Sequence, residues 1–148
     1  MNACKTLAQA ASQPDWPFVP PAIPLFISRV RAGFPSPAED SLEARLNLHD
    51  WLVENPAATF FVRVEGDSMI DEGILSGDVL VVDRGVPIRD KSIIVAVVNG
   101  EFTVKRILMR KPGPVLEPAN SAYDPIQVTD DMEFEIWGVV RYAIHSLC

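Results

Sequence analysis

The stretch SIIVAVVNGEFTVKRIL, residues 92–108, decides the fold class of this chain. Residues 92–98 and 101–108 are rich in β-branched and apolar side chains, which favour extended strands. Asn99-Gly100 stands between the two runs, and this dipeptide is typical of a two-residue hairpin turn because both positions tolerate a positive φ. The stretch therefore predicts two antiparallel strands joined by a tight turn.

Runs of the same character lie on both sides of this hairpin, in residues 59–65, 78–83, 114–118 and 134–144. Glycine, proline and asparagine separate these runs, as expected for turns. Before them, NLHDWLVENP (residues 47–56) predicts one short helix that Asn47 caps and Pro56 ends. Together these patterns predict a mostly β fold: a compact, largely antiparallel domain with one short helix.

The first 38 residues are expected to form an extended N-terminal arm, and residues 39–148 the β-rich domain. Seven of the 13 prolines lie between Pro14 and Pro37. Each proline lacks an N–H and holds the residue before it in an extended conformation, so this segment cannot form a packed domain. Its apolar side chains indicate an arm that lies on its own domain or on a partner.

The bulk composition is that of a globular protein, with 48% hydrophobic and 22% charged residues. A net charge of −7 argues against a large phosphate-binding surface, so no sequence-specific DNA binding is expected. The longest apolar run, residues 93–98, is far shorter than a membrane span, so no membrane association is expected. No apolar signal-peptide region is present, so a cytoplasmic location is expected. Cys4 and Cys148 lack the spacing of a zinc site, and we expect neither a metal nor a cofactor.

Two residues stand out as a candidate nucleophile and base. Strand alternation places Lys105 on the same face as Thr103 and Ile107, where burial would favour the neutral amine that can act as a base. Ser68 lies in the turn GDSM, where its own backbone N–H and that of Met69 could stabilise an oxyanion. A turn serine and a solvated strand lysine without catalysis fit the same pattern.

Four segments together resemble the UmuD/MucA family of SOS mutagenesis proteins, which are relatives of the LexA C-terminal peptidase domain. They are RAGFPSPAED (31–40), FFVRVEGDSMIDEGILSGDVLVVDR (60–84), GEFTVKRILMR (100–110) and NSAY (120–123). The resemblance implies a LexA-like fold and a self-cleaving serine peptidase, with Ser68 as nucleophile, Lys105 as general base and Ala32-Gly33 as the bond that is cut. It also implies a homodimer, stimulation by a RecA–single-stranded DNA filament, and a fragment that serves a UmuC-type translesion polymerase.

The sequence around the implied cleavage site suits an arm that adds to the active site as a strand. UmuD has Cys-Gly at this bond, whereas this chain has Ala32-Gly33, as LexA does. Val30 lies on the same face of an extended strand as Ala32, and Pro35 holds Phe34 extended. Gly33 lets two backbones approach closely. An arm could reach either its own site or that of its dimer partner.

Three other interpretations share part of this pattern. A binding module of the same fold with an inert Ser68/Lys105 pair would not cleave itself. A LexA-type repressor would need a helix-turn-helix domain before the cleavage site, and the proline-rich residues 1–32 are not expected to form one. A signal-peptidase-like enzyme would need a membrane anchor. His49 and His145 are expected to have surface or packing roles.

Overall fold

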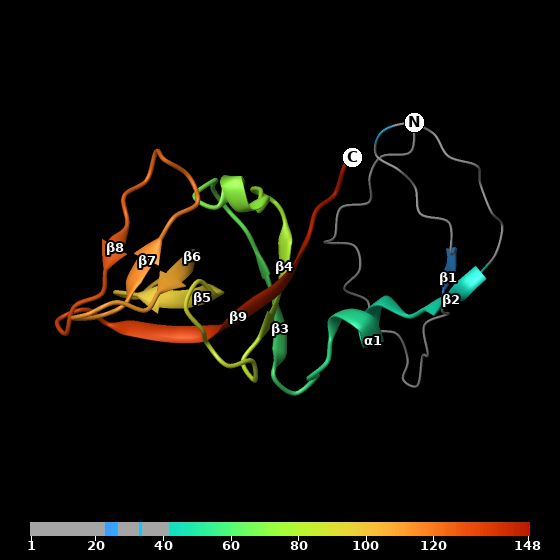
Figure 1. The fold of residues 1–148 in the computed structure, drawn as a ribbon, viewed down its shortest axis with the longest axis horizontal. Coiled ribbons are helices and arrows are strands. Elements are labelled where there is room, and N and C mark those ends of the chain that lie inside the picture. The colour runs from blue at the N-terminus through green and yellow to red at the C-terminus, as the bar shows by residue number, and fades with distance from the viewer. Residues whose placement is uncertain (1–22, 27–32, 34–41) are drawn as a thin grey trace. The chain divides into compact units, whose positions relative to one another are not determined.

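The computed structural model describes residues 23–26, 33 and 42–148 (Figure 1). Residues 52–147 form one compact unit, and the described residues before Leu52 belong to another. Most of the arm expected for residues 1–38 lies outside the described residues, so its extended course remains a prediction. No helix in the described part of the chain is long and apolar enough to cross a membrane.

The first unit contains a two-stranded sheet that the sequence analysis did not predict. β1 (Ile23–Phe26) pairs antiparallel with β2 (Leu42–Leu46). β1 lies within the segment expected to be extended, which agrees with its strand conformation. β2 has the sequence LEARL, whose residues all favour helices when isolated, so cross-strand pairing overrides local propensity here.

The predicted short helix is present as α1 (Leu48–Leu52). Asn47 caps it: the backbone N–H of His49 donates to Asn47 Oδ1 at 3.0 Å, and Asn47 Nδ2 donates to Asp50 Oδ2 at 2.9 Å. The helix ends before Pro56, earlier than predicted. The carbonyl of Asn55 accepts hydrogen bonds from Ala58 N–H and the Thr59 hydroxyl, which makes the following residues a turn.

Seven strands of the second unit form one sheet in which all paired neighbours are antiparallel. They are β3 (Thr59–Arg63), β4 (Val79–Asp83), β5 (Ile93–Val98), β6 (Glu101–Leu108), β7 (Val115–Glu117), β8 (Ile126–Gln127) and β9 (Phe134–Ile144). Their order across the sheet is β3-β4-β9-β5-β6-β7-β8. The predicted mostly β, largely antiparallel fold is confirmed, and β8 is the strand of this sheet that was missed.

The long strand β9 joins two halves of this sheet, as Figure 1 shows. Its C-terminal half pairs with β4 and its N-terminal half with β5, with a register shift in each pairing. The neighbouring strand β4 leaves no room for a side chain at Gly138, where a Cβ would lie 2.8 Å from Val82 Cγ1 and 3.0 Å from the carbonyl oxygen of Asp83. A side chain at this position would force the backbones apart.

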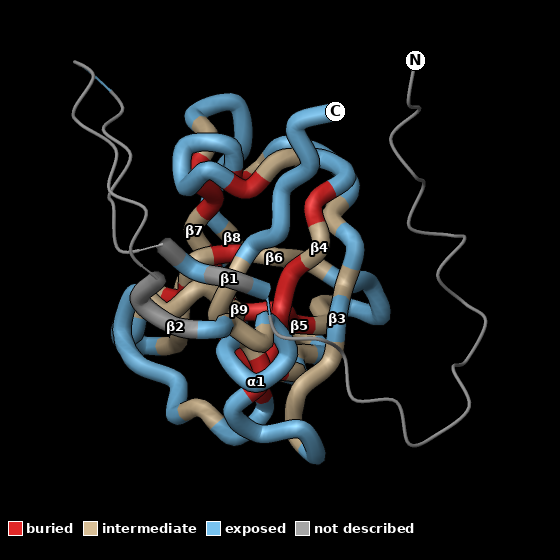
Figure 2. Tube along the Cα trace, turned by 90° about the vertical axis from the view of Figure 1, so that its right-hand side faces the viewer, coloured by how far each residue is buried: buried red, intermediate tan, exposed pale blue. Residues whose placement is uncertain are grey.

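Two clusters of buried side chains form the core, and β4 contributes much of the buried stretch that Figure 2 shows in red. The first consists of Met69, Ile74, Leu80, Val82, Val95 and Ala119. The second consists of Ile94, Ala96, Ile107, Leu116 and Val139. The first cluster includes Met69, the neighbour of Ser68, so core packing anchors the turn that carries the candidate nucleophile.

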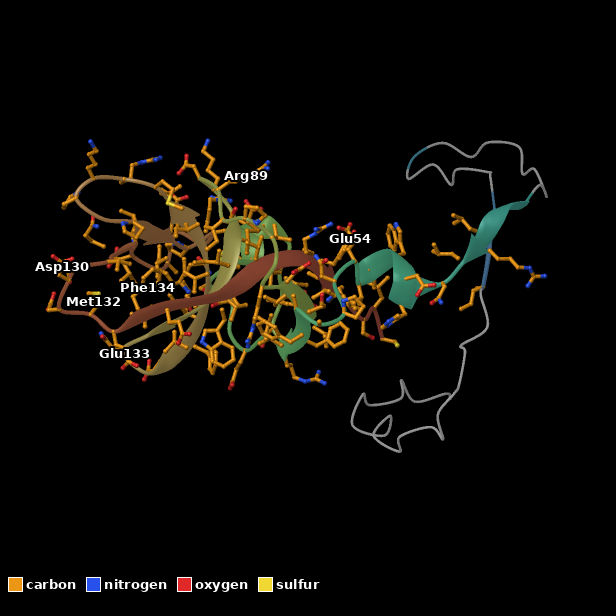
Figure 3. The ribbon with its side chains drawn as sticks, turned by 90° about the horizontal axis from the view of Figure 1, so that it is seen from below. Glu54, Arg89, Asp130, Met132, Glu133 and Phe134 are labelled. Atoms are coloured by element: carbon orange, nitrogen blue, oxygen red, sulfur yellow. The ribbon has the colours of Figure 1, made fainter. Side chains whose placement is uncertain are left out.

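The β5–β6 hairpin follows the prediction from Asn99-Gly100. Six residue pairs are in register, and both turn residues have a positive φ, 49° at Asn99 and 83° at Gly100. Asn99 also binds the segment that enters β9: its N–H donates to the Glu133 carbonyl at 2.8 Å, and its Oδ1 accepts from Glu133 N–H at 3.1 Å. Figure 3 shows Glu133 and its neighbours at this end of the unit.

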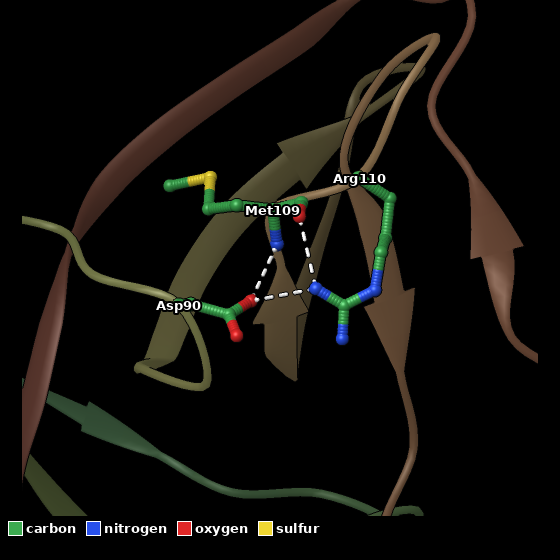
Figure 4. A network of polar contacts seen from close by, with 3 residues as sticks. All are labelled: Asp90, Met109 and Arg110. Carbon is green, nitrogen blue, oxygen red and sulfur yellow. Dashed lines mark hydrogen bonds and ion pairs between the residues drawn. The ribbon is translucent and has the colours of Figure 1, made fainter.

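The other end of β6 is held by a polar network around Asp90 (Figure 4). Asp90 Oδ1 accepts hydrogen bonds from Met109 N–H at 2.7 Å and from the Arg110 guanidinium at 3.2 Å. The same guanidinium donates to the Met109 carbonyl at 2.9 Å. The strand that carries Lys105 is therefore fixed at both ends as well as along its ladder.

Candidate active site

Ser68 lies in the turn that follows β3 and precedes the 3-10 helix η2 (Ile70–Glu72). Gly73 ends that helix with a φ of 75°, and its N–H donates to the Ile70 carbonyl at 2.9 Å. Met69 is only 2% exposed and packs in the core, while Ser68 is half-buried. Burying Met69 holds the turn against the sheet and leaves the Ser68 hydroxyl accessible.

Lys105 lies at hydrogen-bonding distance from Ser68 although 37 residues separate them in sequence. Its Nζ is 2.9 Å from Ser68 Oγ and 2.9 Å from Thr103 Oγ1, and it donates to the Val104 carbonyl at 3.0 Å. Lys105 and Thr103 therefore share one face of β6, as strand alternation predicted, and the Thr103 hydroxyl contacts the amine. The structure brings the candidate nucleophile and the candidate base together.

Burial lowers the pKa of Lys105 from its ordinary value of 10.5. The residue is 8% exposed, and within the described residues no carboxylate forms an ion pair with it. Its polar partners are two hydroxyls and a carbonyl, all uncharged. These surroundings favour the neutral amine, which is the form that can accept a proton from a hydroxyl.

A groove with a volume of about 370 Å³ opens over this pair. The turn from Gly66 to Met69 and β6 residues 102–105 line it, together with residues 62–65 and Tyr123. Phe102 exposes 59% of its surface at the groove, so the lining offers apolar area beside the hydroxyl and the amine. Its walls are two extended segments, a form that suits an extended peptide.

A second loop, for which the sequence pattern indicated no role, binds the nucleophile turn. Asn120 Nδ2 donates to the Asp67 carbonyl at 3.0 Å, and the Tyr123 hydroxyl donates to Asp67 Oδ1 at 2.5 Å. The backbone N–H of Ala119 donates to the Ser68 carbonyl at 2.8 Å. The hydrogen bond to Asp67 raises the pKa of the Tyr123 phenol above 10.0. The NSAY segment was a sequence signal for this loop, but its contacts were not readable from the pattern.

Arg106 links the nucleophile turn to the sheet from the face of β6 opposite Lys105. Its guanidinium forms ion pairs with Glu72 in η2 and with Glu117, its cross-strand neighbour in β7. The sequence pattern gave no sign of these partners. The ion pairs connect the end of the nucleophile turn to the strand that carries Lys105.

The predicted oxyanion donors have no competing acceptor in the part of the chain that the structure describes. Neither the N–H of Ser68 nor that of Met69 donates a hydrogen bond there. Peptide N–H groups without an internal partner remain free to bind an anionic oxygen. This arrangement is compatible with the predicted role of the two residues.

The residues of the predicted cleavage site are largely outside the described part of the chain, and the two histidines have other surroundings than Ser68 and Lys105. Val30, Ala32 and Phe34 lie outside the described residues; Gly33 is described, is exposed, and belongs to the first unit. His145 Nδ1 lies 2.6 Å from the buried carboxylate of Asp78, so this histidine contacts a structural acid rather than Ser68. His49 is exposed on α1.

Comparison with known proteins agrees with this geometry. The family model described as Peptidase S24-like matches residues 24–141. The chain is 47% identical to Protein MucA of Salmonella typhimurium over 130 residues, covering 86% of this chain and 88% of that protein. It is 45% identical to Protein ImpA of Escherichia coli, covering 82% of this chain and 83% of that protein.

A more distant relative is LexA repressor 1 of Xanthomonas axonopodis pv. citri, at 42% identity over 118 residues. The match covers 80% of this chain but 58% of the repressor. The repressor thus shares the region that contains Ser68 and Lys105. The chain belongs to the Peptidase S24-like family, as a UmuD/MucA-type SOS mutagenesis protein with a LexA-like peptidase fold.

Proposed function

We propose that this protein cleaves its own chain between Ala32 and Gly33, with Ser68 as nucleophile and Lys105 as general base. The observation that carries the proposal is the 2.9 Å contact between Ser68 Oγ and the Nζ of a buried lysine whose pKa is lowered. Neutral Lys105 takes the hydroxyl proton while Oγ attacks the carbonyl carbon of Ala32. The N–H groups of Ser68 and Met69 bind the oxyanion.

The second half of the reaction reverses the proton transfer. The Lys105 ammonium gives its proton to the Gly33 nitrogen, the Ala32–Gly33 C–N bond breaks, and an ester remains between Ala32 and Ser68. Water then attacks that ester with Lys105 again as base, which releases the arm and restores the hydroxyl. Every proton that leaves one group in this sequence is received by another, and no metal or cofactor is required.

The arm, residues 1–38, is proposed to enter the groove as an added strand. The groove presents backbone from residues 62–65 and apolar surface from Phe102, which suit an extended backbone and apolar side chains. Val30 and Phe34 flank the bond and supply those side chains. Mixing the Ser68→Ala chain, which has an arm but no nucleophile, with the wild-type chain would distinguish cleavage of a chain's own arm from cleavage of a partner's arm. Cleavage of the Ser68→Ala arm would show that one chain can cut the arm of another.

Family membership supports the wider function. We propose a cytoplasmic homodimer whose cleavage a RecA–single-stranded DNA filament stimulates, and whose fragment Gly33–Cys148 serves a UmuC-type translesion polymerase. Cleavage would remove Lys5, Arg29, Arg31 and Asp15, a side-chain charge of +2, so the net charge changes from −7 to −9. A more acidic fragment suits a protein partner better than bare DNA.

The test is the intact mass of the purified chain after incubation at about pH 10, close to the pKa of an ordinary lysine, where Lys105 with its lowered pKa is largely neutral. We expect a cut between Ala32 and Gly33 in the wild type and none in Ser68→Ala or Lys105→Ala. RecA filament at neutral pH should produce the same two fragments. An unchanged wild-type mass under both conditions would leave a binding module with an inert pair and exclude the peptidase proposal.

A further inference from the structure

We infer that Asn120 is a positioning residue that aims the oxyanion donors of the nucleophile turn. The inference rests on the proposed self-cleavage and adds a residue to its machinery. Asn120 reaches neither the hydroxyl nor the amine; it acts on the backbone of residue 67, one peptide unit before Ser68. Its effect would therefore fall on the direction of N–H groups and leave the protonation of Lys105 unchanged.

The first donor belongs to the peptide unit between Asp67 and Ser68. Its carbonyl oxygen accepts two hydrogen bonds, from Asn120 Nδ2 at 3.0 Å and from Ile70 N–H at 3.2 Å. A trans peptide is planar, and its N–H points opposite to its carbonyl. Fixing the Asp67 oxygen therefore fixes the direction of the Ser68 N–H at the other side of the same plane.

The second donor belongs to the next peptide unit, between Ser68 and Met69, and the same loop holds it. The Ser68 carbonyl accepts from Ala119 N–H at 2.8 Å, and the Ala119 carbonyl accepts from Asp71 N–H at 2.8 Å. Ala119 is 7% exposed and packs in the core cluster of Met69, so this loop segment has little freedom to move. Accepted hydrogen bonds also polarise a peptide and strengthen its N–H as a donor.

The side-chain amide of Asn120 has a defined orientation because its oxygen and its nitrogen each form a hydrogen bond. Its Oδ1 accepts from Ala122 N–H at 2.9 Å, which leaves Nδ2 to donate to the Asp67 carbonyl. Tyr123, on the same loop, binds the Asp67 carboxylate instead of a backbone carbonyl. The loop therefore holds the nucleophile turn by two side-chain contacts. The contact of Asn120 fixes the peptide that carries the Ser68 N–H, and the contact of Tyr123 does not act on that peptide.

These contacts suggest a test with four variants. Asn120→Ala removes both hydrogen bonds, whereas Asn120→Asp keeps an oxygen for Ala122 N–H and loses only the donor to Asp67. Ser121→Asp adds the same charge on the same exposed loop without touching Asp67. Tyr123→Phe removes the contact to the carboxylate. All four are measured as full chains, with the first-order rate of self-cleavage followed by intact mass across the pH range.

We expect Asn120→Ala and Asn120→Asp to slow cleavage equally, by about 10- to 100-fold. Removing an oxyanion donor lowers the rate on the order of 10²- to 10³-fold, and a donor that is only misdirected should lower the rate less. Ser121→Asp should stay within about threefold of the wild type. Tyr123→Phe should slow cleavage less than Asn120→Ala does, because its contact with the Asp67 carboxylate does not reach a donor peptide. The pH midpoint of Asn120→Asp should match that of Ser121→Asp. A wild-type cleavage rate in Asn120→Asp would overturn the inference. So would a pH midpoint of cleavage in Asn120→Ala that differs from that of the wild type.

A second measurement separates this inference from the proposed function. A fluorophosphonate reacts with Ser68 without the arm: a P–O bond forms to Ser68 Oγ, the P–F bond breaks and fluoride leaves. The proton of the Ser68 hydroxyl goes to Lys105. The phosphoryl oxygen of the reagent takes the position of the oxyanion. We expect labelling of Ser68 to slow in both Asn120 variants by the same factor as cleavage. Equal labelling of wild type and Asn120→Asp would overturn the positioning role alone. A wild type that neither cleaves nor labels would overturn both proposals.

Discussion

β6, which carries the proposed base Lys105, and the turn that carries the proposed nucleophile Ser68 are held in place in different ways. Lys105 sits in β6, which is paired on both sides with β5 and β7 and anchored at its end by Asp90. Ser68 sits in an irregular turn, whose backbone is held by hydrogen bonds from a loop about fifty residues away, Asn120 to Asp67 among them with a separation of 53. Regular pairing therefore fixes the proposed base, and single long-range contacts fix the proposed nucleophile.

The difference follows from what each side must supply. A lysine base needs an altered protonation state, and burial on a sheet face provides it with few specific contacts. A serine with two N–H donors needs orientation, which in a turn only particular hydrogen bonds can provide. Changes in the surroundings of Lys105 should therefore move the pH profile, whereas changes on the turn should lower the rate at every pH.

The largest effect is expected from Lys105→Met, which keeps an unbranched apolar side chain of nearly the same length but removes the amine. Self-cleavage should fall by on the order of 10⁴-fold or more at every pH, since loss of one member of a catalytic unit costs nearly as much as loss of the whole unit. Intact mass over an extended incubation measures it. Detectable cleavage in this variant that rises with pH as in the wild type would show that another group is the base.

The same variant tests the burial of the ammonium through stability. Because the folded-state pKa of Lys105 lies below its unfolded value of 10.5, the unfolded chain binds more protons between the two values. The free energy of unfolding of the wild type should therefore rise with pH across that window. Denaturant unfolding at several pH values should show that Lys105→Met lacks this contribution and is relatively more stable below the window. A parallel rise in both chains would contradict the lowered pKa.

A smaller change on the base side is expected from Thr103→Val, which is nearly isosteric. The Thr103 hydroxyl lies 2.9 Å from Nζ and stabilises the ammonium by accepting a hydrogen bond. Its removal should lower the pKa of Lys105 further, so the pH midpoint of cleavage should move down. The plateau rate should fall by about tenfold because the amine loses its orientation. A midpoint that stays in place would assign Thr103 a packing role.

On the turn side, Asp67→Asn should change the titration of Tyr123 more than the cleavage rate. The carboxylate raises the phenol pKa above 10.0, so the stabilisation from this hydrogen bond is present below pH 10.0 and is lost as pH rises through the folded-state value. The variant should titrate at lower pH in phenolate absorbance, with Tyr123→Phe as the control that identifies the signal. Cleavage should change by about threefold or less. An unchanged phenol titration would disprove the Tyr123–Asp67 contact.

The smallest effect is expected from Glu72→Gln, which breaks the ion pair of Arg106 with η2. Both side chains are partly exposed, and such pairs contribute up to about 1 kcal/mol. Cleavage should therefore slow by less than about fivefold, with the pH midpoint unchanged. Glu117→Gln, which affects the same guanidinium but not the turn, is the matched control. A larger loss in Glu72→Gln alone would place this ion pair among the contacts that aim Ser68.

Local sequence patterns predicted the regular parts of the molecule well. The predicted strands 101–108 and 134–144 coincide with β6 and β9, and Asn99-Gly100 forms the expected turn. β2 was missed because its residues favour helices, and β8 because two residues are too few to form a pattern. In both cases pairing with a neighbouring strand determines the conformation, and local propensity does not.

The sequence by itself determined the strand periodicity, the hairpin and the face of β6 on which the lysine lies. It also singled out Ser68 and Lys105 as the candidate nucleophile and base. Only the tertiary structure decided that the two meet at 2.9 Å, that Lys105 is buried enough to lower its pKa, and that Asn120 and Tyr123 hold the turn. Periodicity is a property of neighbouring residues. Contacts between residues 37 or 53 positions apart depend on how a twisted sheet brings its strands and loops together.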